Sequence, residues 1–163
     1  MLIWARPRPV PFACGALLAL AGEALRIWAA GTIHKSRRVT VTGPYAWVRH
    51  PLYVGSFLIM AGYALMCGRW EALVLGLPIF VLFHGAAVVV EEKMLLVLFG
   101  QDYADYSRRV PRLIPRPPAP GAALKAASRS FSWRRVLYNR EPFNIFCVVV
   151  LSLLFGLRLI LHR

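Results

Sequence analysis

Four long runs of apolar residues, separated by polar and strongly basic stretches, dominate the pattern of this chain. A helix needs roughly 20 apolar residues, within a range of about 17–25, to cross the hydrocarbon core of a bilayer. The runs that meet or approach this length cover residues 10–32, 51–68, 72–90 and 143–161. The pattern therefore predicts an all-α protein, a polytopic bundle of about four transmembrane helices.

Proline and charged residues refine this picture. Pro51 suits the first turn of a helix, where its missing N–H is not needed. Pro78 lies inside the third run, where we expect a kink that neighbouring helices tolerate. The first run carries Glu23 and Arg26 and is too long for a secretory signal peptide, so we interpret it as a retained span. These two side chains can neutralise each other at a spacing of three residues; we expect this pairing, with a substrate contact as the alternative.

Composition and charge narrow the class of protein. Of 163 residues, 58% are hydrophobic, and 20 Lys and Arg oppose 7 Asp and Glu, giving a net charge of +13. The apolar runs exclude a soluble globular domain, a disordered tail and a disulfide scaffold. Basic chains often bind nucleic acid, but such a module needs no membrane-length runs, so we expect no nucleic-acid partner.

The distribution of the cations predicts the orientation in the membrane. They concentrate in residues 31–50 and 91–142, and a four-span bundle places both stretches on one side. The positive-inside rule makes that side cytoplasmic. Arg far outnumbers Lys, which is typical of GC-rich bacterial genomes. We therefore expect an integral multi-pass protein of a bacterial inner membrane, with its pocket facing the cytoplasm.

The chain divides into three parts. Residues 1–115 form the expected membrane core, 116–142 a basic linker, and 143–163 an extra C-terminal transmembrane helix. Within the linker, residues 128–140 combine cations with aromatic side chains and are expected to lie along anionic lipid headgroups; an unstructured charged loop is the alternative. The cysteines and histidines lack the spacing of a metal site, so we expect none.

The first candidate for chemistry is the segment that leads into the second run. Arg49 and His50 stand beside the free backbone N–H groups of a helix N-terminus, a combination that attracts a carboxylate or a phosphate. Gly55, one turn further, allows a ligand or another helix to approach the backbone. Anchoring at headgroup depth explains the Tyr, Trp and Arg of this segment equally well.

The second candidate is the acidic pair Glu91 and Glu92 at the end of the third run. Carboxylates are unfavourable at a helix C-terminus. Adjacent side chains point about 100° apart, so one can face inward while the other faces water. A carboxylate there can hydrogen-bond ribose hydroxyls or an ammonium group. The alternative is a helix that continues into a solvated face through Lys93.

These segments together resemble a known family of membrane enzymes. Arg49-His50-Pro51-x-Tyr53-x-Gly55 followed by Glu91-Glu92 is similar to the RHPxYxG…EE signature of the isoprenylcysteine carboxyl methyltransferase and phospholipid methyltransferase superfamily. Residues 45–55, 23–29 and 99–115 resemble further segments of the prenylcysteine enzymes in the same order. The resemblance covers roughly residues 23–115.

The resemblance implies methyl transfer from S-adenosylmethionine, as O- or N-methylation of a lipidic or prenylated small-molecule or peptide substrate that enters from the bilayer. The pocket would lie between the Arg-His-Pro segment and the acidic pair. The absence of any Gly-x-Gly disfavours a soluble Rossmann-type enzyme. We expect Arg49, His50 and Glu92 to be the catalytic residues. The cofactor positions implied are Arg37, Thr40, Tyr45, His50, Pro51, Leu52, Tyr53, Gly55, Glu91 and Glu92.

Two departures from the prenylcysteine enzymes leave the acceptor open. Ala87 occupies the position of an Arg that holds the substrate carboxylate in those enzymes, and Arg37 replaces a His that opens the cofactor loop. Two alternative functions are an NADPH-dependent membrane reductase of the steroid or sterol reductase type and a non-catalytic membrane protein that retains the pocket. No sequence feature indicates the oligomeric state.

Overall fold

The computed structural model describes residues 5–34, 38–117 and 131–161, and within these ranges all regular elements are helices. This confirms the expected all-α fold. Arg37, an expected cofactor position, and residues 118–130 of the expected linker lie outside the described residues. The elements are α1 (Pro9–Thr32), the short 3-10 helix η2 (Gly43–Ala46), α2 (Pro51–Cys67), α3 (Trp70–Phe99), α4 (Gln101–Arg109), α6 (Trp133–Tyr138) and α7 (Glu141–Leu161).

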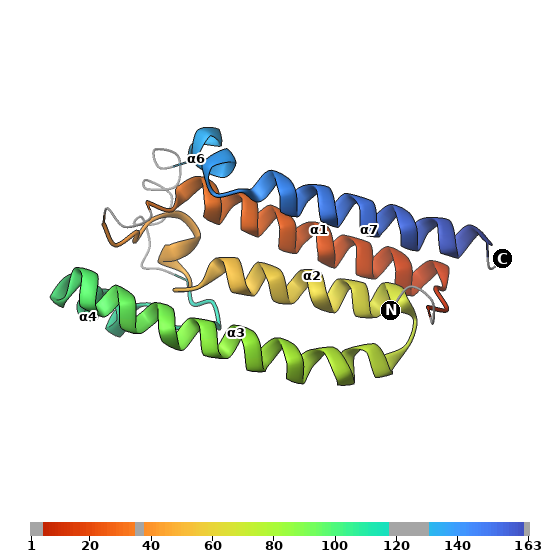
Figure 1. The fold of residues 1–163 in the computed structure, drawn as a ribbon, viewed down its shortest axis with the longest axis horizontal. Helices are drawn as coiled ribbons and strands as arrows, with labels where there is room; N and C mark the ends of the chain where they lie inside the picture. Colours follow the sequence, from red (N-terminus) through yellow and green to blue (C-terminus); the bar gives the residue numbers. More distant parts are fainter. Residues whose placement is uncertain (1–4, 35–37, 118–130, 162–163) are drawn as a thin grey trace.

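The four long helices lie side by side in the order α7, α1, α2 and α3 (Figure 1). The helices α1, α3 and α7 are long and apolar enough to cross a membrane, and α2 is a shorter apolar helix. The chain is therefore a multi-pass membrane protein. The start of α1 and the end of α7 lie at one end of the bundle, and η2, α4 and α6 lie at the other (Figure 1).

The third helix is longer than its apolar run. It continues through Pro78 and past residue 90 to Phe99, so Glu91 and Glu92 lie within α3 and not at its end. The residues after the acidic pair are mostly good helix formers, and no breaker occurs before Gly100, whose φ of 52° ends the helix. The helix therefore continues through Lys93, as one part of the alternative expected, but Glu92 does not lie on a solvated face, because its side chain is only 13% exposed.

Glycines bring the backbones of α1 and α2 into direct contact. A Cβ added at Gly22 would lie 2.6 Å from the carbonyl oxygen of Gly55, and one added at Gly15 would lie 2.5 Å from that of Gly62. The spacing of seven residues within each helix repeats the contact along the antiparallel pair. Close approach at small residues is how helices associate where lipid offers no hydrophobic driving force. This pair is the centre of the bundle.

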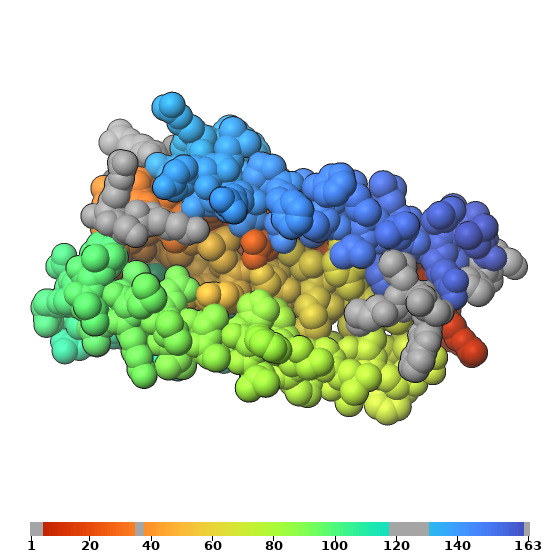
Figure 2. Space-filling view, viewed as in Figure 1, coloured from red at the N-terminus to blue at the C-terminus, as the bar shows by residue number. Residues whose placement is uncertain are grey.

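The outer helices α3 and α7 are attached more loosely. Of the residues of α3, all of them described, only Val88 is buried. The space-filling view shows α3 and α7 as separate ridges, with the surface of α2 visible between them (Figure 2). Tyr63 of α2 holds α7 through a 2.8 Å hydrogen bond from its hydroxyl to the carbonyl of Val148 and through a stacked contact with the ring of Phe155.

Polar side chains add a second connection between α7 and the centre. Arg26 donates to Glu141 at 2.9 Å, and Asn144 donates to Glu23 at 2.5 Å. The expected ion pair between Glu23 and Arg26 is therefore wrong. A buried carboxylate needs a charged or hydrogen-bonding partner, and α7 supplies both partners from more than a hundred residues away in sequence, which a local spacing rule cannot foresee.

The glycine contact generates the first prediction. We expect Gly22→Ala to lower the free energy of unfolding in detergent by about 1–3 kcal/mol, because the new Cβ meets backbone that cannot move aside. Gly85→Ala in α3 is the control, since nothing lies within 4 Å of its added Cβ; alanine should raise helix stability there slightly. Thermal unfolding followed by circular dichroism measures both, and equal midpoints for the two variants would contradict the contact.

Candidate functional site

The loop that enters α2 is shaped by glycine, proline and burial. Gly43 has a φ of 60°, and a Cβ there would press on Thr32 at the end of α1. Pro44 and Tyr45 are buried behind it. His50 then caps α2, with Pro51 in the first turn as expected. The loop is thus fixed between the ends of two central helices.

The carboxylate of Glu92 contacts three side chains, two guanidinium groups and one imidazole. Its Oε1 lies 2.9 Å from Arg49 Nη1 and 3.1 Å from His50 Nε2. Arg112 binds the same carboxylate with both Nε and Nη2, at 3.1 Å and 2.5 Å. The fork geometry is the strong form of an Arg–carboxylate pair, and these bonds raise the pKa of Arg112. Glu92 therefore joins α3, the loop before α2 and the segment after α4.

The neighbouring carboxylate has a different environment. Glu91 is 42% exposed at its side chain against 13% for Glu92, and its Oε2 lies 3.9 Å from His50 Nδ1. The expectation that one member of the acidic pair faces inward and the other outward agrees with this difference. His50, whose side chain is 3% exposed, lies between the two carboxylates.

Backbone hydrogen bonds from the segment that follows α3 hold the loop in place. The N–H of Arg49 donates to the carbonyl of Pro111 at 2.9 Å, and the N–H of Arg116 donates to that of Trp47 at 3.0 Å. The hydroxyl of Tyr106 donates to the carbonyl of Tyr45 at 2.8 Å. Burial raises the pKa of both tyrosines well above its usual value, so both hydroxyls stay protonated as donors at neutral pH.

A cavity of about 1020 Å³ opens beside this loop. One wall is an apolar face of α3, which includes Ala87 and Val90, and the others come from α4, the loop and residues 33–34 and 38–40. Its polar lining includes Arg38, Thr40, Tyr45, Arg49, Glu91 and Tyr103. The hydroxyl of Tyr45 is buried and has no hydrogen-bond partner among the described residues, which marks a place for a polar ligand atom.

The structure divides the expected site residues into two groups. Thr40, Tyr45, Arg49 and Glu91 line the cavity. The other described positions do not line it. Gly55 faces the carbonyl of Gly22 and the side chain of Arg26, and Arg26 and Ser56 both donate to the carbonyl of Leu52. His50, Pro51, Tyr53 and Glu92 likewise lie outside the lining.

Some residues of the site escaped the sequence analysis. Arg112, which completes the cluster on Glu92, is one of them. Arg38 and Val39, which also line the cavity, lie between Arg37 and Thr40, the two positions that the resemblance assigns to the cofactor loop. Tyr103 and Tyr106 belong to residues 99–115, a segment that resembles the family. That resemblance is the sequence feature that could have indicated their place in the site. Arg112 lies within the same segment, residues 99–115. In the part of the chain that the structure describes, no cluster of side chains suited to a metal occurs.

Comparison with known proteins supports the family resemblance. A family model described as phospholipid methyltransferase matches residues 12–102, more than half of the chain. The protein-S-isoprenylcysteine O-methyltransferase of Schizosaccharomyces pombe is 32% identical over 95 residues, which are 58% of this chain and 40% of that protein. The methanethiol S-methyltransferase of Crocosphaera subtropica is 39% identical over 71 residues, 44% of this chain and 27% of that protein.

A third relative carries a different kind of name. The cobalt-zinc-cadmium resistance protein CzcN of Cupriavidus metallidurans is 33% identical over 93 residues, 56% of this chain and 43% of that protein. No solved structure matches the chain. The chain spans about 40% of the length of the curated relatives named first. On the match to the family model and the motifs of the site, the chain belongs to the phospholipid methyltransferase family, within the superfamily that includes the isoprenylcysteine carboxyl methyltransferases.

Proposed function

We propose that the chain is an integral-membrane methyltransferase that uses S-adenosylmethionine. The observation that carries the proposal is the cavity between the Arg49 loop and α3, most of whose lining lies in the segment that matches the family. Its volume is at the upper limit of roughly 300–1,000 Å³ for small-molecule sites, which leaves room for a cofactor and an acceptor group.

The polar lining suits the chemical groups of this cofactor. Glu91 offers an acceptor for ribose hydroxyls or an ammonium group, and Arg38 and Arg49 offer partners for a carboxylate. The buried hydroxyl of Tyr45 gains a partner when a polar ligand atom lies beside it. The residues present therefore fit the cofactor.

Side chains next to the cavity but outside its lining position the side chains that line it. When bound, S-adenosylmethionine supplies a methyl group on a sulfonium, and transfer is an in-line displacement that depends on alignment. Glu92 holds the guanidinium of Arg49 at the edge of the cavity, and His50 bridges Glu92 and Glu91. Arg49 and Glu91 touch the ligand; His50 and Glu92 are positioning residues. The first turns of α2, which support these residues, are fixed by Pro51, Leu52, Tyr53 and Gly55.

The acceptor is lipidic or apolar and approaches along α3. That helix contributes Ala86, Ala87, Val90 and Met94 to the cavity and is otherwise exposed along its length. The names of two relatives indicate acceptors as different as an isoprenylated cysteine and methanethiol, and each of these carries an apolar group, the isoprenyl chain or the methyl group. The cation-rich end of the bundle, where the cavity opens, faces the cytoplasm of a bacterial cell.

Cofactor binding gives the second prediction. S-adenosylhomocysteine should bind the purified protein in detergent, and Glu91→Gln should weaken binding by about tenfold or more, because a charged hydrogen-bond acceptor is lost. Glu71→Gln is a matched control, since Glu71 lies on the same helix with the same side-chain exposure of 42% at the opposite end of α3. Isothermal titration calorimetry measures both.

Two results would overturn the assignment. One is equal S-adenosylhomocysteine affinity in the Glu91→Gln and Glu71→Gln variants. The other is stabilisation of the protein by NADPH with no response to S-adenosylhomocysteine, which would indicate a reductase instead.

The positioning role of Glu92 gives the third prediction. We expect Glu92→Gln to raise the dissociation constant for S-adenosylhomocysteine about tenfold, because Arg49 loses the carboxylate that orients it. Arg112→Gln removes a half-exposed partner of Glu92 that does not line the cavity, so it should change this affinity by less than about threefold.

Affinity and the thermal unfolding midpoint are measured on the same samples. If Glu92 serves stability alone, its variant will have a lower midpoint and unchanged affinity well below that temperature. That result would refute the positioning role.

A further inference from the structure

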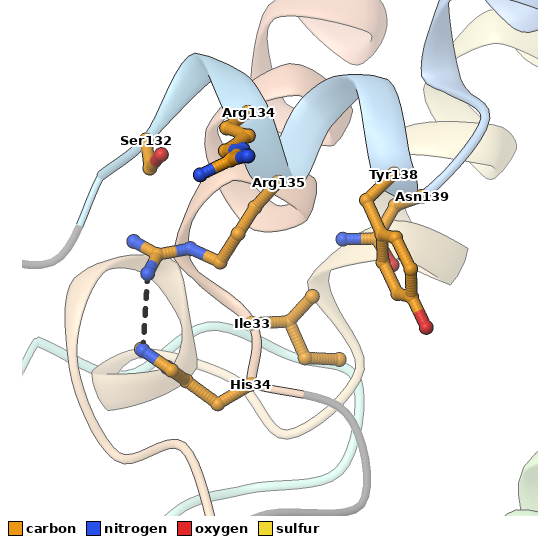
Figure 3. A pocket seen from close by; sticks show the side chains of 7 residues that line it. All are labelled: Ile33, His34, Ser132, Arg134, Arg135, Tyr138 and Asn139. Atoms are coloured by element: carbon orange, nitrogen blue, oxygen red, sulfur yellow. Dashed lines mark hydrogen bonds between the residues drawn. The ribbon is translucent and has the colours of Figure 1, made fainter.

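A second cleft lies at the same end of the bundle, between the last turn of α1 and the short helix α6 (Figure 3). Its volume is about 430 Å³. Residues of α6 and its flanks form most of the lining, outside the segment that matches the family model. The polar residues of the lining are His34, Ser132, Arg134, Arg135, Tyr138 and Asn139.

The cleft is held in shape by hydrogen bonds to the end of α1. Arg135 Nε donates to the carbonyl of Gly31 at 2.7 Å, and Asn139 Nδ2 donates to that of Ala30 at 2.8 Å. The N–H of Ser132 also donates to Gly31, at 2.9 Å. The last carbonyls of a helix lack partners within it, and here α6 satisfies them. Val136, which is 2% exposed, fixes α6 against the bundle.

The charge of the cleft is not balanced by protein carboxylates. Figure 3 shows Arg135 reaching from α6 to His34, whose Nε2 accepts from Arg135 Nη1 at 3.0 Å. Arg38 Nη2 approaches the same nitrogen at 3.2 Å. The sequence contains no Asp or Glu between Glu23 and Glu71, and none between residues 105 and 141. Neighbouring cations of this kind repel one another unless an anion lies between them.

The nearest acidic residue in sequence does not supply that anion. Glu141 follows α6 directly, but it is 4% exposed and is paired with Arg26. An external anion is therefore needed to balance Arg134 and Arg135.

The exposed side chains around the cleft indicate where the anion comes from. Trp133, Leu137 and Tyr138 of α6 are 66%, 65% and 81% exposed. Aromatic and apolar side chains exposed at the end of a bundle of spans are typical of the membrane–water interface. Arginines on such a helix lie at the depth of the lipid phosphates, where each adds about 1 kcal/mol of attraction to anionic lipid.

We propose that this cleft binds the phosphate of an anionic phospholipid headgroup from the surrounding leaflet. Arg134 and Arg135 contact the phosphate oxygens, Tyr138 and Asn139 flank the glycerol region, and Trp133 and Leu137 lie among the acyl chains. The site is distinct from the cavity beside α3, although Ile33 and His34 contribute to the lining of both.

Native mass spectrometry of the full chain in detergent tests the proposal without any methyl donor. The added lipids are phosphatidylglycerol and phosphatidylcholine with identical acyl chains. We expect the wild-type protein to prefer phosphatidylglycerol, and Arg134→Gln to weaken its binding about fivefold, the effect of one interfacial cation. The side chain of Arg134 makes no hydrogen bond or ion pair among the described residues. Its replacement therefore leaves the attachment of α6 to the bundle intact. Arg134→Lys should restore most of the affinity.

Arg108→Gln is the control, because Arg108 is 73% exposed and paired only with Asp105 in α4 among the described residues. An equal loss in Arg108→Gln and Arg134→Gln would overturn the proposal, as would equal binding of the two lipids by the wild-type protein. Displacement of phosphatidylglycerol by millimolar inorganic phosphate would also overturn it, since that result would indicate a site for a soluble anion.

Discussion

The site at the end of the bundle depends on one carboxylate, that of Glu92. It binds Arg49 and His50 before α2, and Arg112 after α4. Because α3 buries almost none of its surface, side-chain packing alone would hold this end of the helix weakly. A nearly buried carboxylate bonded to two guanidinium groups and one imidazole supplies directional bonds instead. The geometry of the cavity therefore follows from electrostatics more than from hydrophobic packing.

The bundle combines a tight centre with loosely attached outer helices. Glycines let α1 and α2 touch backbone to backbone, and α7 is joined to this pair by Tyr63 and by the polar contacts of Glu23 and Arg26. Polar groups inside a membrane protein are unfavourable unless they are paired. Pairing across helices thus fixes which helix lies next to which, while the outer faces of α3 and α7 remain available to lipid.

The sequence predicts the parts of this structure that have short-range causes. Apolar runs of sufficient length indicate the four long helices, Pro51 marks the start of α2, and the family motifs indicate which loop and which carboxylates meet. The pairing of Glu23 and Arg26 could not be predicted locally, because their partners come from α7. Hydropathy alone also missed the full length of α3, since the charged residues 91–93 interrupt the apolar run while the helix continues through them to Phe99. The role of Arg112 depends on a chain reversal after α4 that no periodicity indicates.

The length of α3 fixes the depth of the cavity in the bilayer. At 1.5 Å per residue, the stretch from Trp70 to Glu91 rises about 30 Å, which equals the thickness of a typical hydrocarbon core. With Trp70 at one boundary of that core, Glu91 lies at the other, between the acyl chains and the headgroups. An amphiphile whose tail stays in the acyl layer carries its head group at this level. Such a molecule can reach the cavity by two-dimensional diffusion within one leaflet, without ever being extracted into water.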